Sequence, residues 1–100
     1  MSKQPYDGYI LNVIRMYPKL KTIDTPSKKQ AFWKNAVESA ILETEKLPDG
    51  LERLKIIDLL FWRRTHTMDG VAIHLHLSYE TVRRRRRSFL RMVEKKLINF

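Results

Sequence analysis

Five consecutive arginines, Arg83–Arg87, have the clearest chemical capacity in this chain. A guanidinium group donates paired hydrogen bonds to a phosphate, or to O6 and N7 of guanine. Residues 63–100 hold ten basic and three acidic residues, whereas residues 1–62 hold ten and eight, within a net charge of +9. A basic segment of this kind is typical of nucleic-acid binding, because contacts to phosphates release condensed counterions. The charge pattern therefore predicts a polyanionic partner, double-stranded DNA first.

The arginines must be divided among the faces of the helix that carries them, because a helix has about 3.6 residues per turn. If Val82 points inward, Phe89 and Val93 lie within about 20° of the same direction at ~100° per residue. The opposite face then carries Glu80, Arg83, Arg84, Arg87 and Arg91, with Tyr79 at its flank. That face is the predicted recognition surface.

Arg85 and Arg86 point more inward on the same helix. Their aliphatic stems are expected to cover apolar surface. Their charged ends are expected to reach carboxylates such as Asp58, or backbone phosphates at the rim of the interface.

Two helix caps precede this face and predict a helix-turn-helix. Thr67 is expected to cap a short helix and Ser78 a long one. The motif also needs a small contact residue, an apolar residue closing the turn and a buried residue early in the second helix. Ala72, Leu77 and Val82 fill these positions.

In such a motif the second helix lies in the major groove, with its first turns against base edges. Ser78 leaves helix N-terminal amides able to meet a phosphate, and Tyr79 can donate to phosphate or pack on a thymine methyl. Glu80 can accept from cytosine N4, or simply stabilise the positive end of the helix dipole. The candidate DNA-binding residues are Thr67, Ser78, Tyr79, Glu80, Thr81, Arg83, Arg84, Arg87 and Arg91.

Helical periodicity dominates the rest of the 100 residues, so we expect an all-α fold, a small helical domain of about five helices with a C-terminal helix-turn-helix. Pro18 is expected to end a first helix, and Thr25 with Pro26 to start the second. The expected helices are 7–16, 25–46, 51–64 and the two of the motif. We treat 1–100 as one domain, with 1–50 a dimer or partner surface and 51–100 the DNA-binding part.

The motif resembles a known family. Thr67–Phe89 resembles the helix-turn-helix of sigma-factor region-four-like proteins, with matches at Thr67, Ala72, Leu77, Ser78, Thr81 and Val82. About half the chain, LERLKIIDLLFWRRTHTMDGVAIHLHLSYETVRRRRRSFLRMVEKKL, is similar to RinA-type transcriptional activators of phages infecting Gram-positive bacteria. The resemblance implies a role in switching on late genes for packaging and morphogenesis. His76 departs from the pattern, because helix-turn-helix proteins favour glycine there.

Other site chemistries lack support. There is no cysteine, and His74 and His76, two apart on a helix, would face different directions, so we expect no metal. Without a glycine-rich phosphate loop or a convincing acidic pair, we expect no enzyme, cofactor or small-molecule substrate. The longest apolar run, Ile56–Trp62, is interrupted by Asp58, so we expect no membrane span. The expected location is the cytoplasm of a bacterial host cell, at the nucleoid.

The leading hypothesis is a sequence-specific DNA-binding transcriptional regulator, a phage or prophage late-gene activator that contacts host RNA polymerase. The alternatives are a repressor, an RNA-binding protein, a mobile-element protein that binds an acidic host protein, and a tail, residues 89–100, that lies on a membrane. A homodimer is also a hypothesis, because the second helix has more apolar surface than one neighbour would cover. That surface comprises Phe32, Trp33, Val37 and Ile41.

Overall fold

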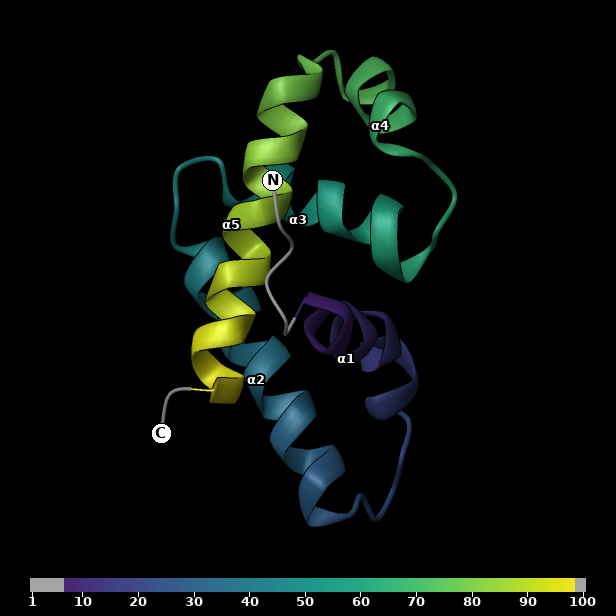
Figure 1. The fold of residues 1–100 in the computed structure, drawn as a ribbon, viewed down its shortest axis with the longest axis vertical. Coiled ribbons are helices and arrows are strands. Elements are labelled where there is room, and N and C mark those ends of the chain that lie inside the picture. Colours follow the sequence, from purple (N-terminus) through teal and green to yellow (C-terminus); the bar gives the residue numbers. More distant parts are fainter. Residues whose placement is uncertain (1–6, 99–100) are drawn as a thin grey trace.

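Helices make up all the regular structure in residues 7–98, the part of the chain that the computed structural model describes. The elements are α1 (Asp7–Leu20), α2 (Lys28–Glu45), α3 (Gly50–Ile57), the π-helix η1 (Asp58–Trp62), α4 (Met68–Leu75) and α5 (Tyr79–Ile98). This confirms the expected all-α fold. Helix α5 contacts each of the other four α-helices and runs from beside α4 to the middle of α2 (Figure 1).

Helix α5 joins two clusters of buried side chains. The main cluster joins its C-terminal half to α1, α2, Ile57 and Phe61. The smaller α4 cluster consists of Ile56, Leu59, Val71, Ala72 and Val82. The inward stripe expected from periodicity is confirmed, because Val82, Phe89 and Val93 are all buried. One face of α5 is thereby committed to the core, which turns the opposite face of its first turns outward.

Helix α1 does not end before Pro18, as expected, but continues to Leu20. Proline has no N–H, so the carbonyl of Ile14 loses its usual donor four residues on. The Trp62 indole Nε1 donates to that carbonyl at 2.9 Å. A side chain from η1 therefore satisfies the group that the proline leaves open, and the helix is extended by one turn.

Helix α2 begins two residues later than expected, after Ser27 rather than Thr25. The Ser27 hydroxyl accepts from the Gln30 N–H at 3.1 Å, and the Gln30 side chain accepts from the Ser27 N–H at 2.9 Å. This reciprocal capping box satisfies two amide donors, whereas a cap at Thr25 would satisfy one. The spacing of Ser27 and Gln30 is typical of a capping box, and the prediction of a start at Thr25 did not use it.

The expected helix 51–64 is also revised, because α3 ends at Ile57 and continues as a π-helix to Trp62. The Arg63 N–H bonds to the carbonyl of Asp58, five residues back, at 2.7 Å. The wider turn sends Leu59 into the α4 cluster and Phe61 into the main cluster. One short segment thus supports both ends of α5.

Three helices pack on α2 and cover most of the apolar surface that motivates the homodimer hypothesis, although Phe32 is 37% exposed; the dimer itself stays a prediction. Val37 is fully buried, and Trp33 and Ile41 pack against the main cluster. The Trp33 Nε1 also donates to the Tyr9 hydroxyl at 2.8 Å. The apolar surface of this helix is therefore largely covered within the chain.

Gly50, the first residue of α3, lies against the end of α2 and has no room for a side chain. A Cβ there would lie 2.2 Å from the carbonyl oxygen of Thr44 and 3.0 Å from the Cα of Glu45. We expect Gly50→Ala to lower the free energy of unfolding, measured in urea, by about 1–3 kcal/mol. The matched control is Gly8→Ala in α1, where a Cβ meets nothing within 4 Å. Equal stability of the two variants would contradict this reading.

Candidate nucleic-acid interface

The turn between α4 and α5 comprises residues 76–78 and is closed by backbone hydrogen bonds. His76 adopts the left-handed conformation, with φ 57° and ψ 44°. The Leu77 N–H bonds to the Ala72 carbonyl at 2.8 Å, and the His76 N–H to the Ile73 carbonyl at 3.3 Å. This is the pattern of a Schellman motif, which usually has glycine at the left-handed position. The histidine accordingly accepts the backbone conformation for which glycine is favoured.

Both predicted caps are confirmed. The Thr67 hydroxyl accepts from the Gly70 N–H at 3.1 Å, and the Ser78 hydroxyl accepts from the Thr81 N–H at 3.1 Å. The Ser78 hydroxyl also donates to Thr81 Oγ1 at 2.8 Å. The three hydroxyl groups are therefore held at the helix starts, where they fix the positions of α4 and α5.

Four of the predicted residues are brought together on the exposed side of the first turns of α5. We call this set the exposed α5 face; it lines a hollow of about 220 Å³ and consists of Glu80, Arg83, Arg84 and Arg87. Tyr79, 46% exposed, stands beside it at the helix start. The face is thus opposite the buried stripe, as helical geometry requires.

Glu80 and Arg83 form an ion pair within the exposed α5 face. Arg83 Nη2 lies 2.9 Å from Glu80 Oε1 and 3.1 Å from Oε2, and Arg83 Nε donates to Oε1 at 3.3 Å. The hydrogen bond from Arg83 lowers the pKa of Glu80, so the carboxylate stays ionised. Within residues 7–98 neither Arg84 nor Arg87 has an ion-pair partner. Arg84 and Arg87 therefore carry the net positive charge of this face.

Arg91 lies apart from this face, although the helical wheel placed it there. Its Nη2 lies 2.6 Å from Asp7 Oδ1 and its Nη1 2.6 Å from Glu94 Oε1, and its side chain is 33% exposed. The hydrogen bond to Asp7 raises the pKa of Arg91. The ion pair between Arg91 and Asp7 therefore links α5 to α1.

Arg85 is inward, as expected, but its partner is not Asp58. Its guanidinium pairs with Asp49, at 3.0 Å, and with Glu52, and its side chain is 15% exposed. Asp58 instead pairs with Arg63 at 2.9 Å. The carboxylates are supplied by Asp49, in the turn before α3, and by Glu52, in the first turn of α3.

Arg86 is a functional candidate that the predicted set omitted. Its guanidinium lies over the Phe61 ring, 5.5 Å from the centroid. Burial lowers its pKa, the charge of Asp7 acts in the opposite direction, and the neighbouring Arg15 and Arg87 lower the pKa further. Arg86 has no ion pair with any described carboxylate. The sequence predicts that Arg86 points inward and that its charged end reaches a carboxylate or a backbone phosphate, but Arg86 is not among the predicted DNA-binding residues.

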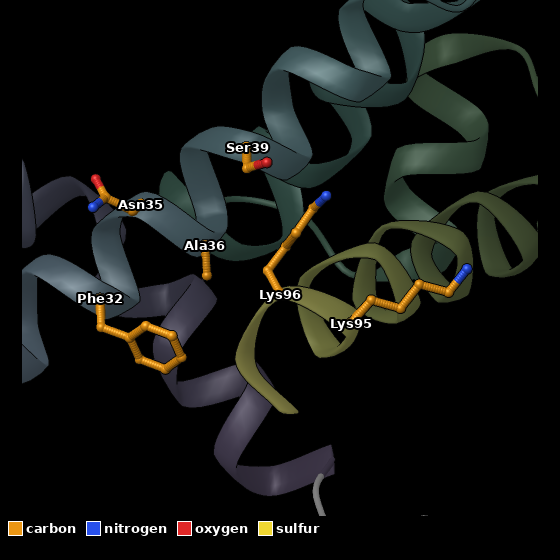
Figure 2. A pocket seen from close by; sticks show the side chains of 6 residues that line it. All are labelled: Phe32, Asn35, Ala36, Ser39, Lys95 and Lys96. Carbon is orange, nitrogen blue, oxygen red and sulfur yellow. The ribbon is translucent and has the colours of Figure 1, made fainter. Parts of the chain in front are cut away.

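A separate hollow of about 470 Å³ lies at the other end of α5, against α2, and is lined by Phe32, Asn35, Ala36, Ser39, Lys95 and Lys96. Figure 2 shows Lys96 extending toward α2 while Lys95 points away from it. Lys96 pairs with Glu43 of α2. This hollow does not adjoin the exposed α5 face, because seven residues of α5 separate Arg87 from Lys95.

The histidines do not assemble a metal site. The rings of His66 and His74 lie 5.0 Å apart, and His76 occupies the turn. Across residues 7–98, no group of three or more side chains that could hold a metal ion is found. In the same range, no helix combines the length and apolar character needed to cross a bilayer.

Comparisons of the chain with protein-family models, with curated proteins and with solved structures found no match. The resemblance of residues 51–97 to the phage activators therefore stays a prediction. The features of this chain that bear on function are the charge, exposure and pairing of the side chains around the first turns of α5.

Proposed function

We propose that this protein is a sequence-specific DNA-binding transcriptional regulator that places the first turns of α5 in the major groove. The observation that carries the proposal is the exposed α5 face, where Arg84 and Arg87 project without ion-pair partners in the described chain. The helix that bears them follows a capped three-residue turn, the arrangement that helix-turn-helix proteins use to enter the groove.

The mixture of acceptors and donors on this face favours base reading over contact with phosphates alone. A purely basic surface binds any sequence, because every phosphate is alike. Glu80 repels phosphate and suits a donor such as cytosine N4, while an arginine beside it suits guanine. Arg83, which is held by Glu80, keeps its Nη1 group for a base or phosphate.

The class of regulator follows from the resemblance of residues 51–97 to RinA-type activators. We infer a phage or prophage late-gene activator, with host RNA polymerase as its second partner. Activation and repression use the same DNA-binding chemistry and differ in where the site lies relative to the promoter.

The experiment that tests the proposal is the selection of bound fragments from random duplex DNA at about 150 mM salt, where contacts to phosphates alone are already weakened. We expect one enriched motif. Two half-sites spaced by about one helical turn of DNA would indicate a dimer on the DNA. Retention without enrichment would overturn sequence-specific reading. A structured RNA that outcompetes the duplex would favour the RNA alternative, and no retention would favour an acidic protein partner.

A further inference from the structure

A third hollow, of about 340 Å³, lies between α5 and α1, on the side of Arg83 and Arg87 opposite the hollow of the exposed α5 face. Its lining includes Asp7 and Leu11 from α1, and Tyr79, Arg86 and Arg91 from α5. We call it the α1–α5 hollow. It adjoins the exposed α5 face, because Arg83 and Arg87 line both hollows.

The charges in the α1–α5 hollow do not balance within the described chain. Asp7 is the one carboxylate in its lining, and Arg91 already binds it at 2.6 Å. Arg83 is bound by Glu80. Among the described residues this leaves Arg86 and Arg87 without an ion pair, although Asp7 acts on Arg86 at longer range.

Arg86 is held in a fixed position by its packing. Its guanidinium lies over Phe61, a core residue, and the Arg15 guanidinium lies 5.9 Å from the centroid of the same ring. Arg15 is not part of the lining of the hollow but stands one helical turn beyond Leu11, which is. Two cations therefore contact one ring, and the carboxylate whose charge acts on Arg86 is Asp7, which is already bound to Arg91. An anion bound there would remove their repulsion and find a guanidinium whose orientation is already set.

We infer that the α1–α5 hollow binds one phosphodiester of the DNA backbone, with Arg86 as its anchor and Arg87 at its flank. The inference rests on the proposed function and adds a contact beside the base-reading surface. The Tyr79 hydroxyl, at the hollow's rim, can donate a further hydrogen bond to the same phosphate. Such a contact carries no sequence information but sets the register of α5 in the groove.

The first test compares Arg86→Gln with the wild type on the selected site and on random duplex, across a salt series. We expect affinity to fall about tenfold on both DNAs, and the slope of log K against log salt to become shallower by about 1, with the selected motif unchanged. Arg86→Lys keeps the charge but loses the paired donors, so we expect it to retain the slope and lose part of the affinity. Lys95→Gln, an equal change of charge on the distant turn of α5, is the matched control.

The second test asks which phosphate Arg86 contacts, and it compares losses within each protein, so a uniform drop in the variant's affinity cancels. Each phosphate of the selected site is replaced in turn by a neutral methylphosphonate, and the loss of affinity is measured for wild type and for Arg86→Gln. We expect one position at which the wild type loses about tenfold and Arg86→Gln loses nothing further.

Three outcomes overturn the inference. The first is an Arg86→Gln variant that binds like Lys95→Gln. The second is a set of methylphosphonate losses that are the same in both proteins at every position. The third is a pair of results: inorganic phosphate shifts the Arg86 Nε–H resonance, but no methylphosphonate position depends on Arg86. This would assign the hollow to a free anion. All three leave the enriched motif intact, whereas failure of the proposed function removes the motif itself.

Discussion

Replacing Arg84 and Arg87 together by glutamine is expected to weaken binding to the selected DNA site by at least about 100-fold. Both guanidinium groups are exposed and have no ion pair within residues 7–98, so their donors are free for guanine or phosphate. Glutamine keeps the helix propensity and removes the charge. We therefore expect the melting temperature to be unchanged.

The measurement is equilibrium binding at about 150 mM salt to the selected site and to a random duplex of equal length. The matched control is Lys28→Gln with Lys95→Gln, which removes the same charge from the two exposed ends of α2 and α5. The expected loss is larger on the selected site than on random DNA. Equal losses on both would reduce these arginines to phosphate contacts and contradict base reading. For the wild type, about five neutralised phosphates correspond to a slope of log K near −4 to −5.

Phe89→Ala is expected to lower the free energy of unfolding by about 3–5 kcal/mol. Phe89 is 3% exposed in the main cluster. Its ring meets that of Trp62 edge to face, with centroids 6.3 Å apart. Truncation would leave a cavity at the point where α5 packs on η1, the segment that supports both clusters. The same helix bears the exposed α5 face, so loss of this packing is also expected to disrupt the surface that we propose to bind DNA.

The measurement is urea unfolding followed by circular dichroism. A domain of this size has about 5–15 kcal/mol in total, so the variant is expected to be near its limit of stability. Leu51→Ala is the control, because Leu51 is 81% exposed and its truncation should change stability by less than about 0.5 kcal/mol. A loss below about 1 kcal/mol for Phe89→Ala would contradict the core described here.

Local chemistry was readable before any tertiary contact was known. A period of 3.6 residues turns Val82, Phe89 and Val93 to one side, and that is where the core lies. A hydroxyl next to a helix start satisfies amides within the same turn, so Thr67 and Ser78 could be identified as caps. The prediction was wrong where two local signals compete. Thr25 with Pro26 is typical of a helix start, but α2 begins after Ser27, because Ser27 and Gln30 form two reciprocal hydrogen bonds.

Helix boundaries that depend on distant groups were not readable. Pro18 disfavours helix for the residues before it, yet α1 continues because Trp62 donates to the open carbonyl of Ile14. The two residues that meet there are 48 positions apart, and no local pattern announces their contact. The π-helix arises in the same way, since it serves two clusters at once.

By itself, the sequence determined the helical class, the capped turn and the concentration of positive charge on one helix, because these follow from neighbours within a few residues. Only the tertiary structure decided what each arginine does. Arg91 forms an ion pair with Asp7, Arg85 forms one with Asp49 in the turn before α3, and the Arg86 guanidinium packs over the Phe61 ring. Arg84 and Arg87 have no ion pair in the described chain, because Glu80, the carboxylate beside them, is bound to Arg83. The physical reason is that a charge is compensated by whatever carboxylate the fold brings within about 4 Å, and that distance is set by packing between segments far apart in the chain.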